Sequence, residues 1–377
     1  MIRRVLMTTD TVGGVWTYAL ELCRAFRRHR VEVALATMGA PLDASQTAEA
    51  AALPGLQIYE SAYRLEWMRE PWDDVNESGA WLLDLERQVA PDIVHLNGYS
   101  HASLPFAAPV LVVGHSCVLS WWRAVRREPA PLEWETYYQR VARGLRAADL
   151  VVTPTSTMLR WLEYLYGPLQ HVRVIPNGRQ RALFPPLSKE PCVLGAGRLW
   201  DEAKNVQALA RVAPRLPWPV LVAGDGQHPE GGGAGELANL RHLGRLAPSD
   251  LASWLGHAAI YALPARYEPF GLSILEAALA GCALVLGDID SLRELWDGCA
   301  LFVPPEDDEA LSSALDALIR DEVQRRRLAA RCRRRALELS PERMAEGYLQ
   351  AYREAGLPRH RAPLPAPLPY RERFLAS

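Results

Sequence analysis

The sequence predicts an α/β protein made of two doubly wound domains, and three observations support this prediction. In the first half, short apolar strands alternate with helical segments, which is typical of a parallel sheet covered by helices on both faces. A fresh strand opens the second half after the proline-containing stretch 183–191, which we interpret as a linker. The chain has 377 residues, enough for two domains of ordinary size. We therefore expect domains at 1–182 and 183–340, and a Pro/Arg-rich tail at 359–377.

The composition argues against several classes of protein. The formal net charge is −2, so nothing general indicates a nucleic-acid partner. Six scattered cysteines lie mostly in apolar runs without Cys-x2-Cys spacing, so we expect buried free thiols, no zinc site and a reducing cytoplasm. The N-terminus runs directly into a strand without the apolar core of a signal peptide, and no apolar run is long enough to span a membrane. We therefore expect a soluble, cytoplasmic protein.

The first half carries six predicted strands, at 5–9, 31–36, 92–96, 110–113, 150–152 and 172–175. Helical periodicity is clearest at 16–27, 80–89 and 132–148. Ligands of doubly wound sheets bind at the carboxyl ends of the strands. Three of these ends carry polar residues, at 97–101, 115–116 and 153–156.

Two strand ends of the first half are candidate ligand sites. Gly13 and Gly14 join the first strand to the first helix, as in a phosphate-binding loop, although glycine pairs are also common in ordinary turns. His115 follows the strand at 110–113, where its imidazole can reach a ligand or merely bind a neighbouring loop. His95 lies inside its strand, so we interpret it as a hydrogen-bonded core residue. The aromatic segment 119–138 is predicted to pack on the core, with an acceptor platform as the alternative.

The second half begins with the strand 192–196 and a turn containing Arg198 and Lys204. A forked guanidinium and a point-charge ammonium can together neutralise a diphosphate leaving group. An ordinary surface pair is the alternative, but Lys204 is one of two lysines among 42 basic residues. Further strands are predicted at 219–223, 259–263 and 283–287.

The stretch 265–281 is a loop that runs into an apolar helix ending at Gly281. Backbone amides at the helix start, around Gly271 to Ser273, form an anion site. Glu268 precedes this site and Glu276 lies one turn inside the helix, so an anion held there has a carboxylate ahead of it and another beside it. A nucleoside diphosphate carrying a sugar fits this arrangement, whereas a core helix with incidental glutamates is the alternative.

A family resemblance appears at this stretch. Read as Glu-Pro-Phe-Gly-Leu-x-x-Leu-Glu-Ala from Glu268 to Ala277, it resembles the Glu-x7-Glu signature of retaining GT-B glycosyltransferases, family 4 and its glycogen-synthase-like relatives. The Gly-Arg…Lys-Asn turn at 197–205 and the Pro-Asn-Gly at 176–178 resemble further family motifs. The resemblance covers nearly the whole chain. It implies a GT-B fold of two Rossmann-like domains facing a central cleft, with the C-terminal helix 341–356 completing the first domain.

The resemblance also implies roles for individual residues. Arg198 and Lys204 grip the donor phosphates, Glu268 binds sugar hydroxyls, and Glu276 binds the ribose. The other residues expected around the donor are His115, Gly13, Gly14, Phe270, Gly271, Leu272 and Ser273. No metal or other cofactor is expected, because arginine and lysine neutralise the leaving group. We interpret Asp288-Ile289-Asp290 as a turn.

The expected function is transfer of a sugar, with retention, from a nucleotide-diphosphate sugar to a hydroxyl acceptor that is a glycan, a lipid-linked molecule or a small molecule. Two alternatives are a GT-B nucleotide-sugar epimerase and a non-catalytic nucleotide-sugar-binding protein. We interpret the arginine-rich segment 325–335 as a solvated helix face, with a peripheral membrane patch as the alternative. We therefore expect membrane association to be peripheral at most.

Overall fold

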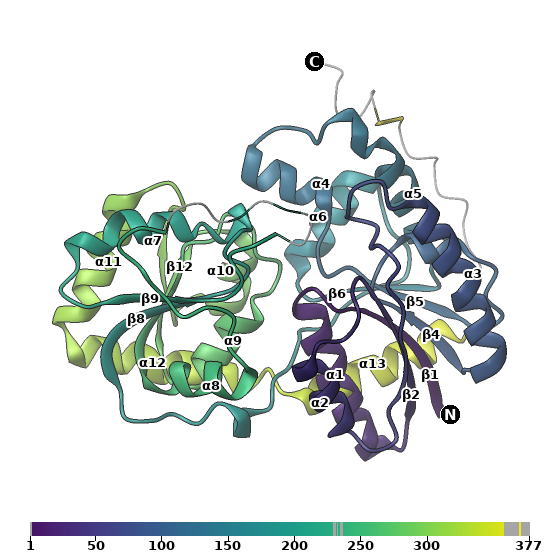
Figure 1. Ribbon diagram of the computed structural model, residues 1–377, viewed down its shortest axis with the longest axis horizontal. Helices are drawn as coiled ribbons and strands as arrows, with labels where there is room; N and C mark the ends of the chain where they lie inside the picture. The colour runs from purple at the N-terminus through teal and green to yellow at the C-terminus, as the bar shows by residue number, and fades with distance from the viewer. Residues whose placement is uncertain (1, 229–230, 232, 234–236, 358–368, 371–377) are drawn as a thin grey trace. The chain divides into compact units, whose positions relative to one another are not determined.

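The computed structural model describes residues 2–228, 231, 233, 237–357 and 369–370, and the chain forms two compact units. The first comprises Met1–Pro176 and Pro341–Ser377, and the second comprises Asn177–Ser340. Each unit is a parallel sheet with helices on both faces (Figure 1). The predicted α/β class is confirmed.

The sheet of the first unit has seven strands in the order β3-β2-β1-β4-β5-β6-β7, and all recorded pairs are parallel. The strands are β1 (Arg4–Asp10), β2 (Glu32–Met38), β3 (Gln57–Tyr59), β4 (Ile93–Leu96), β5 (Val110–Val113), β6 (Leu150–Thr153) and β7 (Val172–Val174). The helices are α1 (Gly14–Phe26), α2 (Ala44–Ala51), α3 (Trp72–Val89), α4 (Val118–Trp121), α5 (Glu135–Ala147), α6 (Ser156–Tyr166) and α13 (Pro341–Ala355). Short 3-10 turns lie at Arg27–His29, Ser100–Ser103 and Leu132–Trp134, and a π-helical turn at Trp122–Arg126.

The strand order reverses direction between β1 and β4, because β2 leaves β1 on one side and β4 joins it on the other. Side chains of the central strands β4, β5 and β6 are buried throughout, and their sequences are apolar except for His95 and Thr153. In sheets of this type, ligands bind outside the carboxyl ends of the strands at such a reversal, which here lies at β1 and β4.

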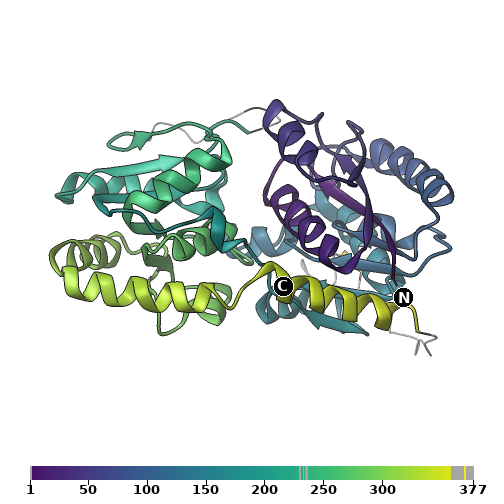
Figure 2. The ribbon, with the colours of Figure 1, turned by 90° about the horizontal axis from the view of Figure 1, so that it is seen from below.

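The last helix, α13, returns to the first unit and packs against α1 (Figure 2). Its apolar stripe is fully buried and includes Tyr348 and Tyr352. Burial of two tyrosines from the far end of the chain ties that end to the first sheet.

The second unit has a six-stranded parallel sheet in the order β10-β9-β8-β11-β12-β13. The strands are β8 (Glu190–Ala196), β9 (Val220–Ala223), β10 (Arg241–His242), β11 (Ala258–Leu263), β12 (Ala283–Gly287) and β13 (Leu301–Val303). The helices are α7 (Val206–Val212), α8 (Pro248–His257), α9 (Leu272–Leu279), α10 (Asp290–Trp296), α11 (Asp308–Arg320) and α12 (Glu322–Ala336). Short 3-10 turns lie at Arg181–Leu183, Glu202–Lys204 and Ala213–Arg215.

Successive residues of its central strands enter two different cores. In β12, Leu284 and Leu286 pack in the core with α9, while Ala283 and Val285 pack in the core with α7 and α11. This period-2 alternation places one apolar layer on each face of the sheet.

The chain passes between the units earlier than the sequence predicts. The predicted boundary lies between residues 182 and 183, whereas the second unit begins at Asn177. The reason is that Arg179 pairs with Glu276, and Phe184 is buried in the second core. The stretch 183–191, interpreted as a linker, therefore lies inside the second unit.

Other predicted features have varied outcomes. All six cysteines are free and buried, as predicted. The edge strands β3 and β13 were not predicted, since both are short. Of the predicted tail 359–377, only residues 369 and 370 lie within the described part of the chain, and Tyr370 packs against Tyr138 in the first core. No helix of the described residues is long and apolar enough to cross a membrane.

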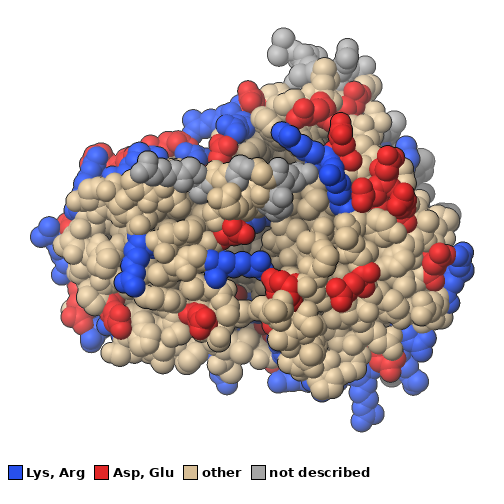
Figure 3. Space-filling model, in the orientation of Figure 1, with Lys and Arg blue, Asp and Glu red and all other residues tan. Residues whose placement is uncertain are grey.

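Several arginines of the helix α12 contact other parts of the second unit. Arg333 and Arg335 donate to the carbonyls of Leu279 and Leu295, and the guanidinium of Arg325 lies over Trp218. On the face of the molecule drawn in Figure 3, both signs of charge are interspersed over the two units.

A close backbone contact in the first unit gives a stability prediction. A methyl group added at Gly144 of α5 would lie 1.9 Å from the carbonyl oxygen of Tyr99, which is backbone and cannot rotate away. We expect Gly144→Ala to lower the free energy of unfolding by about 1–3 kcal/mol, although alanine favours a helix over glycine by about 1 kcal/mol. Urea denaturation followed by circular dichroism measures this difference.

Gly79→Ala on α3 is the matched control. Its added methyl would meet the side chain of Leu104 at 3.2 Å, which can shift, so the loss should be smaller. Equal stability of Gly144→Ala and the wild type would contradict the close contact.

Candidate functional site

Loops after β8, β9 and β11 converge at the carboxyl edge of the second sheet. Gly197 and Leu199, in the loop after β8, donate backbone hydrogen bonds to Ala223 at the end of β9 and to Asp225 just after it, at 3.0 and 2.8 Å. The amide of Arg266, after β11, donates to the carbonyl of Ala203 at 2.8 Å. Parallel pairing of the three strands brings these loops together.

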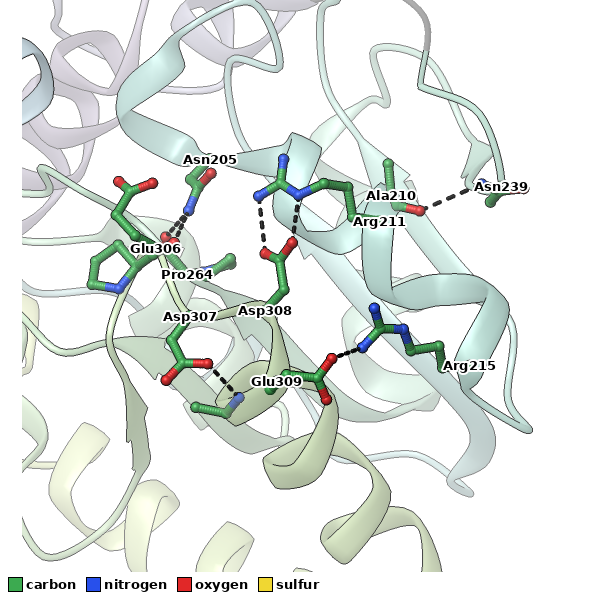
Figure 4. A network of polar contacts seen from close by, with 12 residues as sticks. Asn205, Ala210, Arg211, Arg215, Asn239, Pro264, Glu306, Asp307, Asp308 and Glu309 are labelled. Atoms are coloured by element: carbon green, nitrogen blue, oxygen red, sulfur yellow. Dashed lines mark hydrogen bonds and ion pairs between the residues drawn. The ribbon is translucent and has the colours of Figure 1, made fainter.

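Lys204 and Glu268 form a buried ion pair within this loop cluster. The Nζ atom of Lys204 lies 2.6 Å from Oε2 of Glu268, and the side chains are 13% and 11% exposed. Asn205 adopts a left-handed conformation, with φ of 54°, and its Nδ2 donates to the carbonyls of Pro264 and Pro305 (Figure 4). Asn205 therefore ties the lysine turn to the start of the loop that carries Glu268.

Arg198 lies in the same loop but is more accessible. Its side chain is 41% exposed, its Nη2 is 2.9 Å from Oδ2 of the buried Asp201, and its guanidinium lies over the ring of Trp200. Asp201 also accepts from the amide of Ala203 and so caps the turn that leads to Lys204. The Asp201 carboxylate thus orients the Arg198 guanidinium and also caps the turn that contains Lys204.

The start of helix α9 presents backbone donors at the same edge. Gly271 is its N-cap, with φ of 85°, a conformation that favours glycine. The amides of Leu272 and Ser273 follow at the first helical positions, where no intrahelical acceptor exists. The Ser273 hydroxyl is within 2.8 Å of the Tyr261 hydroxyl, whereas the Phe270 side chain is buried in the core. Phe270 can therefore offer a ligand its backbone only.

Glu276, one turn into α9, has a cationic partner that sequence reasoning missed. The Nε atom of Arg179 lies 2.8 Å from its Oε1, and both side chains are less than a tenth exposed. The guanidinium of Arg179 also lies over the ring of Phe184, and its backbone amide donates to Leu339. The signal available in the sequence was a basic residue directly after Pro-Asn-Gly, at the crossing between the two units.

In the first unit, the predicted residues lie at the carboxyl edge of the first sheet. The amide of Gly13 donates to Oδ1 of Asp10, and Gly13 is the N-cap of α1. Nε2 of His115 lies 2.8 Å from Oδ1 of Asn97, and its ring meets Tyr18 edge-on at 4.5 Å. Burial lowers the pKa of His115, so the ring is neutral.

Comparison with known proteins assigns both units to one class. Residues 12–181 match a family model described as Glycosyltransferase Family 4, and residues 190–321 match one described as Glycosyl transferases group 1. The chain is 30% identical over 243 residues to a glycogen synthase of Mycobacterium tuberculosis, an alignment that spans 58% of each chain. It is 27% identical over 357 residues to a phosphatidyl-myo-inositol mannosyltransferase of Mycolicibacterium smegmatis, spanning 86% of each.

Solved structures show the same fold. Sucrose-phosphate synthase from Thermosynechococcus elongatus superposes with a TM-score of 0.79 at 20% identity, covering 93% of this chain and 98% of that one. Anabaena Alr3699/HepE, in complex with UDP-glucose, has a TM-score of 0.74 at 14% identity, covering 92% and 98%.

The chain belongs to the GT-B glycosyltransferases. The predicted GT-B fold and enzyme class are therefore confirmed. In this glycosyltransferase, the residues predicted to surround the donor fall into two sets. The second unit brings together Arg198, Lys204, Glu268, Gly271, Leu272, Ser273 and Glu276, with Phe270 turned into the core. The first unit holds Gly13, Gly14 and His115 at its own sheet edge.

The structure also shows the surroundings of His95 and of the Asp288-Ile289-Asp290 segment. His95 is fully buried and hydrogen-bonded, as expected of a core histidine. Asp288 forms a forked ion pair with Arg293, and Asp290 begins α10. Within the described residues, no group of three or more His, Cys, Asp or Glu side chains is arranged to hold a metal ion.

The Arg179–Glu276 pair gives a second prediction. Arg179→Met leaves a buried carboxylate without this cation, so the free energy of unfolding should fall by about 3–5 kcal/mol. Arg179→Met combined with Glu276→Leu removes both charges and should recover most of that loss. Urea denaturation of the single and double variants measures the difference.

The control is Arg215→Ala, which breaks the exposed Arg215–Glu309 pair seen in Figure 4. That change should cost less than about 1 kcal/mol. If the double variant were as unstable as the single one, the two side chains would not be energetically coupled.

Proposed function

We propose that this chain transfers a sugar from a nucleoside-diphosphate sugar to a hydroxyl acceptor with retention at the anomeric carbon. The observation that carries the proposal is the grouping of Arg198, Lys204, Glu268 and the first amides of α9 at one sheet edge. This grouping offers two cations and a set of backbone donors to the phosphates, next to carboxylates suited to hydroxyls.

The cations act on the leaving group. As the bond between sugar and phosphate breaks, negative charge develops on the diphosphate, and preorganised donors stabilise that charge more than they stabilise the substrate. Lys204 has three N–H donors, of which one binds Glu268. Arg198 is exposed enough to turn from Asp201 toward a phosphate.

The carboxylates orient the donor. Glu268 is held by Lys204 and accepts hydrogen bonds from sugar hydroxyls, while Glu276 is held by Arg179 and accepts from the ribose. An ion-paired carboxylate is a weak nucleophile, so the catalytic contribution of Glu268 is electrostatic and positional. His115 and the backbone of Gly13 and Gly14 bind the transferred sugar in the same proposal, in which no metal ion takes part.

Support for a nucleotide-sugar donor also comes from relatives. Alr3699/HepE holds UDP-glucose in its complex, and the matched relatives include a mannosyltransferase and a glycogen synthase. The alignment with that glycogen synthase spans just over half of its length, so donor and acceptor are to be tested for this chain itself.

The donor site is tested by calorimetric titration with UDP, GDP and ADP. One of the three should bind, and Arg198→Ala and Glu276→Gln should each weaken that binding about tenfold to a hundredfold, because a hydrogen bond to a charged group contributes about 1.5–3 kcal/mol. Arg215→Ala, on the exposed surface, is the control and should bind like the wild type.

Two results would count against the proposal. If none of the three diphosphates bound to folded protein, or if both variants bound like the wild type, the assigned donor site would be wrong. Circular dichroism of each variant separates lost binding from lost folding.

Product analysis distinguishes transfer from epimerisation. Incubation of the enzyme with UDP-glucose, GDP-mannose or ADP-glucose in the absence of an acceptor should release the free sugar slowly, with its original anomeric configuration. Proton NMR spectra recorded before mutarotation show the anomer. An epimerised nucleotide sugar would identify an isomerase, and the opposite anomer would exclude retention.

A further inference from the structure

A chain of buried and half-buried polar side chains runs from α13 to His115 in the first unit. The hydroxyl of Tyr352 lies 2.6 Å from Nδ1 of His95, and Nε2 of His95 lies 3.2 Å from Oδ1 of Asn97. The same Asn97 oxygen lies 2.8 Å from Nε2 of His115. The hydroxyl of Tyr18 is 3.3 Å from Nε2 of His95. The C-terminal helix is thereby connected to the histidine at the sheet edge.

The backbone of β1 determines which way the Asn97 amide points. Its Nδ2 donates to the carbonyl of Thr8 at 2.6 Å, and a carbonyl can only accept. The backbone N–H of Asn97 donates to the hydroxyl of Thr8 at 2.9 Å, which holds the residue beside β1. Oδ1 must therefore face the two histidines, because the opposite orientation would place two acceptors against each other at Thr8.

This orientation determines where both imidazoles carry their protons. An amide oxygen accepts only, so Nε2 of His95 and Nε2 of His115 must both be protonated. Burial lowers the pKa of each ring to about 3, so each is neutral and has one N–H. Nδ1 of His95 is then an acceptor, which matches the hydroxyl of Tyr352 beside it. Nδ1 of His115 is likewise an acceptor, and it has no hydrogen bond to any described residue.

We propose that Asn97 is a positioning residue that holds His115 as a neutral acceptor at Nδ1, and that His95 and Tyr352 hold Asn97 in turn. The inference rests on the proposed function in one respect: the group that His115 accepts from is a hydroxyl of the transferred sugar. An acceptor nitrogen binds an O–H group and repels a carboxylate. The site is therefore selective for a neutral sugar with a hydroxyl at this position and discriminates against a uronic acid there.

The protonation pattern can be measured without any substrate. In protein labelled with ¹⁵N at histidine, with His115→Gln used to assign the signal, His115 should be the Nε2–H tautomer. Asn97→Leu, similar in size but without an acceptor, should shift that signal toward the other tautomer.

A matched pair of variants in α13 tests the contact between Tyr352 and His95. Tyr352→Phe removes the donor to Nδ1 of His95 and should move the ¹⁵N shift of that nitrogen, while Asn97 keeps the proton of His95 on Nε2. Tyr348→Phe is the control, because its ring lies 5.2 Å from the His95 ring but its hydroxyl makes no hydrogen bond with His95. An Nδ1–H tautomer of His115 in the wild type, or no change in Asn97→Leu, would overturn the proposal.

The sugar contact is tested separately with whichever of UDP-glucose, GDP-mannose or ADP-glucose is turned over. Asn97→Leu should raise the KM for that nucleotide sugar about tenfold, while the Kd for the corresponding nucleoside diphosphate stays unchanged. If the tautomers behaved as expected but neither Asn97→Leu nor His115→Gln altered KM, the sugar contact would be refuted and the donor site of the second unit would stand. If instead the wild type bound no nucleoside diphosphate, the proposed function itself would be refuted.

Discussion

Parallel strand pairing is the constraint on which the rest of the structure depends. Every recorded strand pair between named strands in both sheets is parallel, so the carboxyl ends of all strands in a unit lie at one edge. Loops that are far apart in sequence, such as those after β8 and β11, therefore meet at this edge. A polar residue placed directly after a strand becomes part of a shared site.

The cations of the candidate donor site all have carboxylate partners in this structure. Lys204 is paired with Glu268, Arg198 with Asp201 and Arg179 with Glu276. Removing a buried charge from water is costly unless the charge is paired, so the pairs keep the site stable without a ligand. In the proposed function, binding of a diphosphate is an exchange of ion-pair partners, in which the exposed Arg198 leaves its carboxylate at the lowest free-energy cost and the buried Lys204 keeps Glu268 in place.

Much of this arrangement could be predicted from single residues and their spacing. The loop from Glu268 to Gly271, the Arg198 turn and the strand before His115 were all identifiable, because each combines a strand end with a residue type of limited chemistry. The pairing of Arg179 with Glu276 could not be predicted, since the two residues are nearly a hundred positions apart and the motif around Arg179 does not require a cation. The predicted boundary at 182 failed for the same reason: proline content indicated a linker, whereas a buried ion pair decided where the second unit begins.

The sequence by itself determined the fold class, because apolar runs of strand length alternating with helical periodicity permit few arrangements other than doubly wound sheets. It also identified residues that the structure brings together at the candidate donor site, such as Arg198, Lys204 and Glu268. Tertiary structure alone decided the partners of those residues and the protonation of the histidines. The orientation of Asn97, for example, follows from the Thr8 carbonyl in β1, and the His95 ring beside Asn97 meets the hydroxyl of Tyr352 from the other end of the chain. Hydrogen bonds of this kind depend on distance and direction in space, which local sequence patterns do not encode.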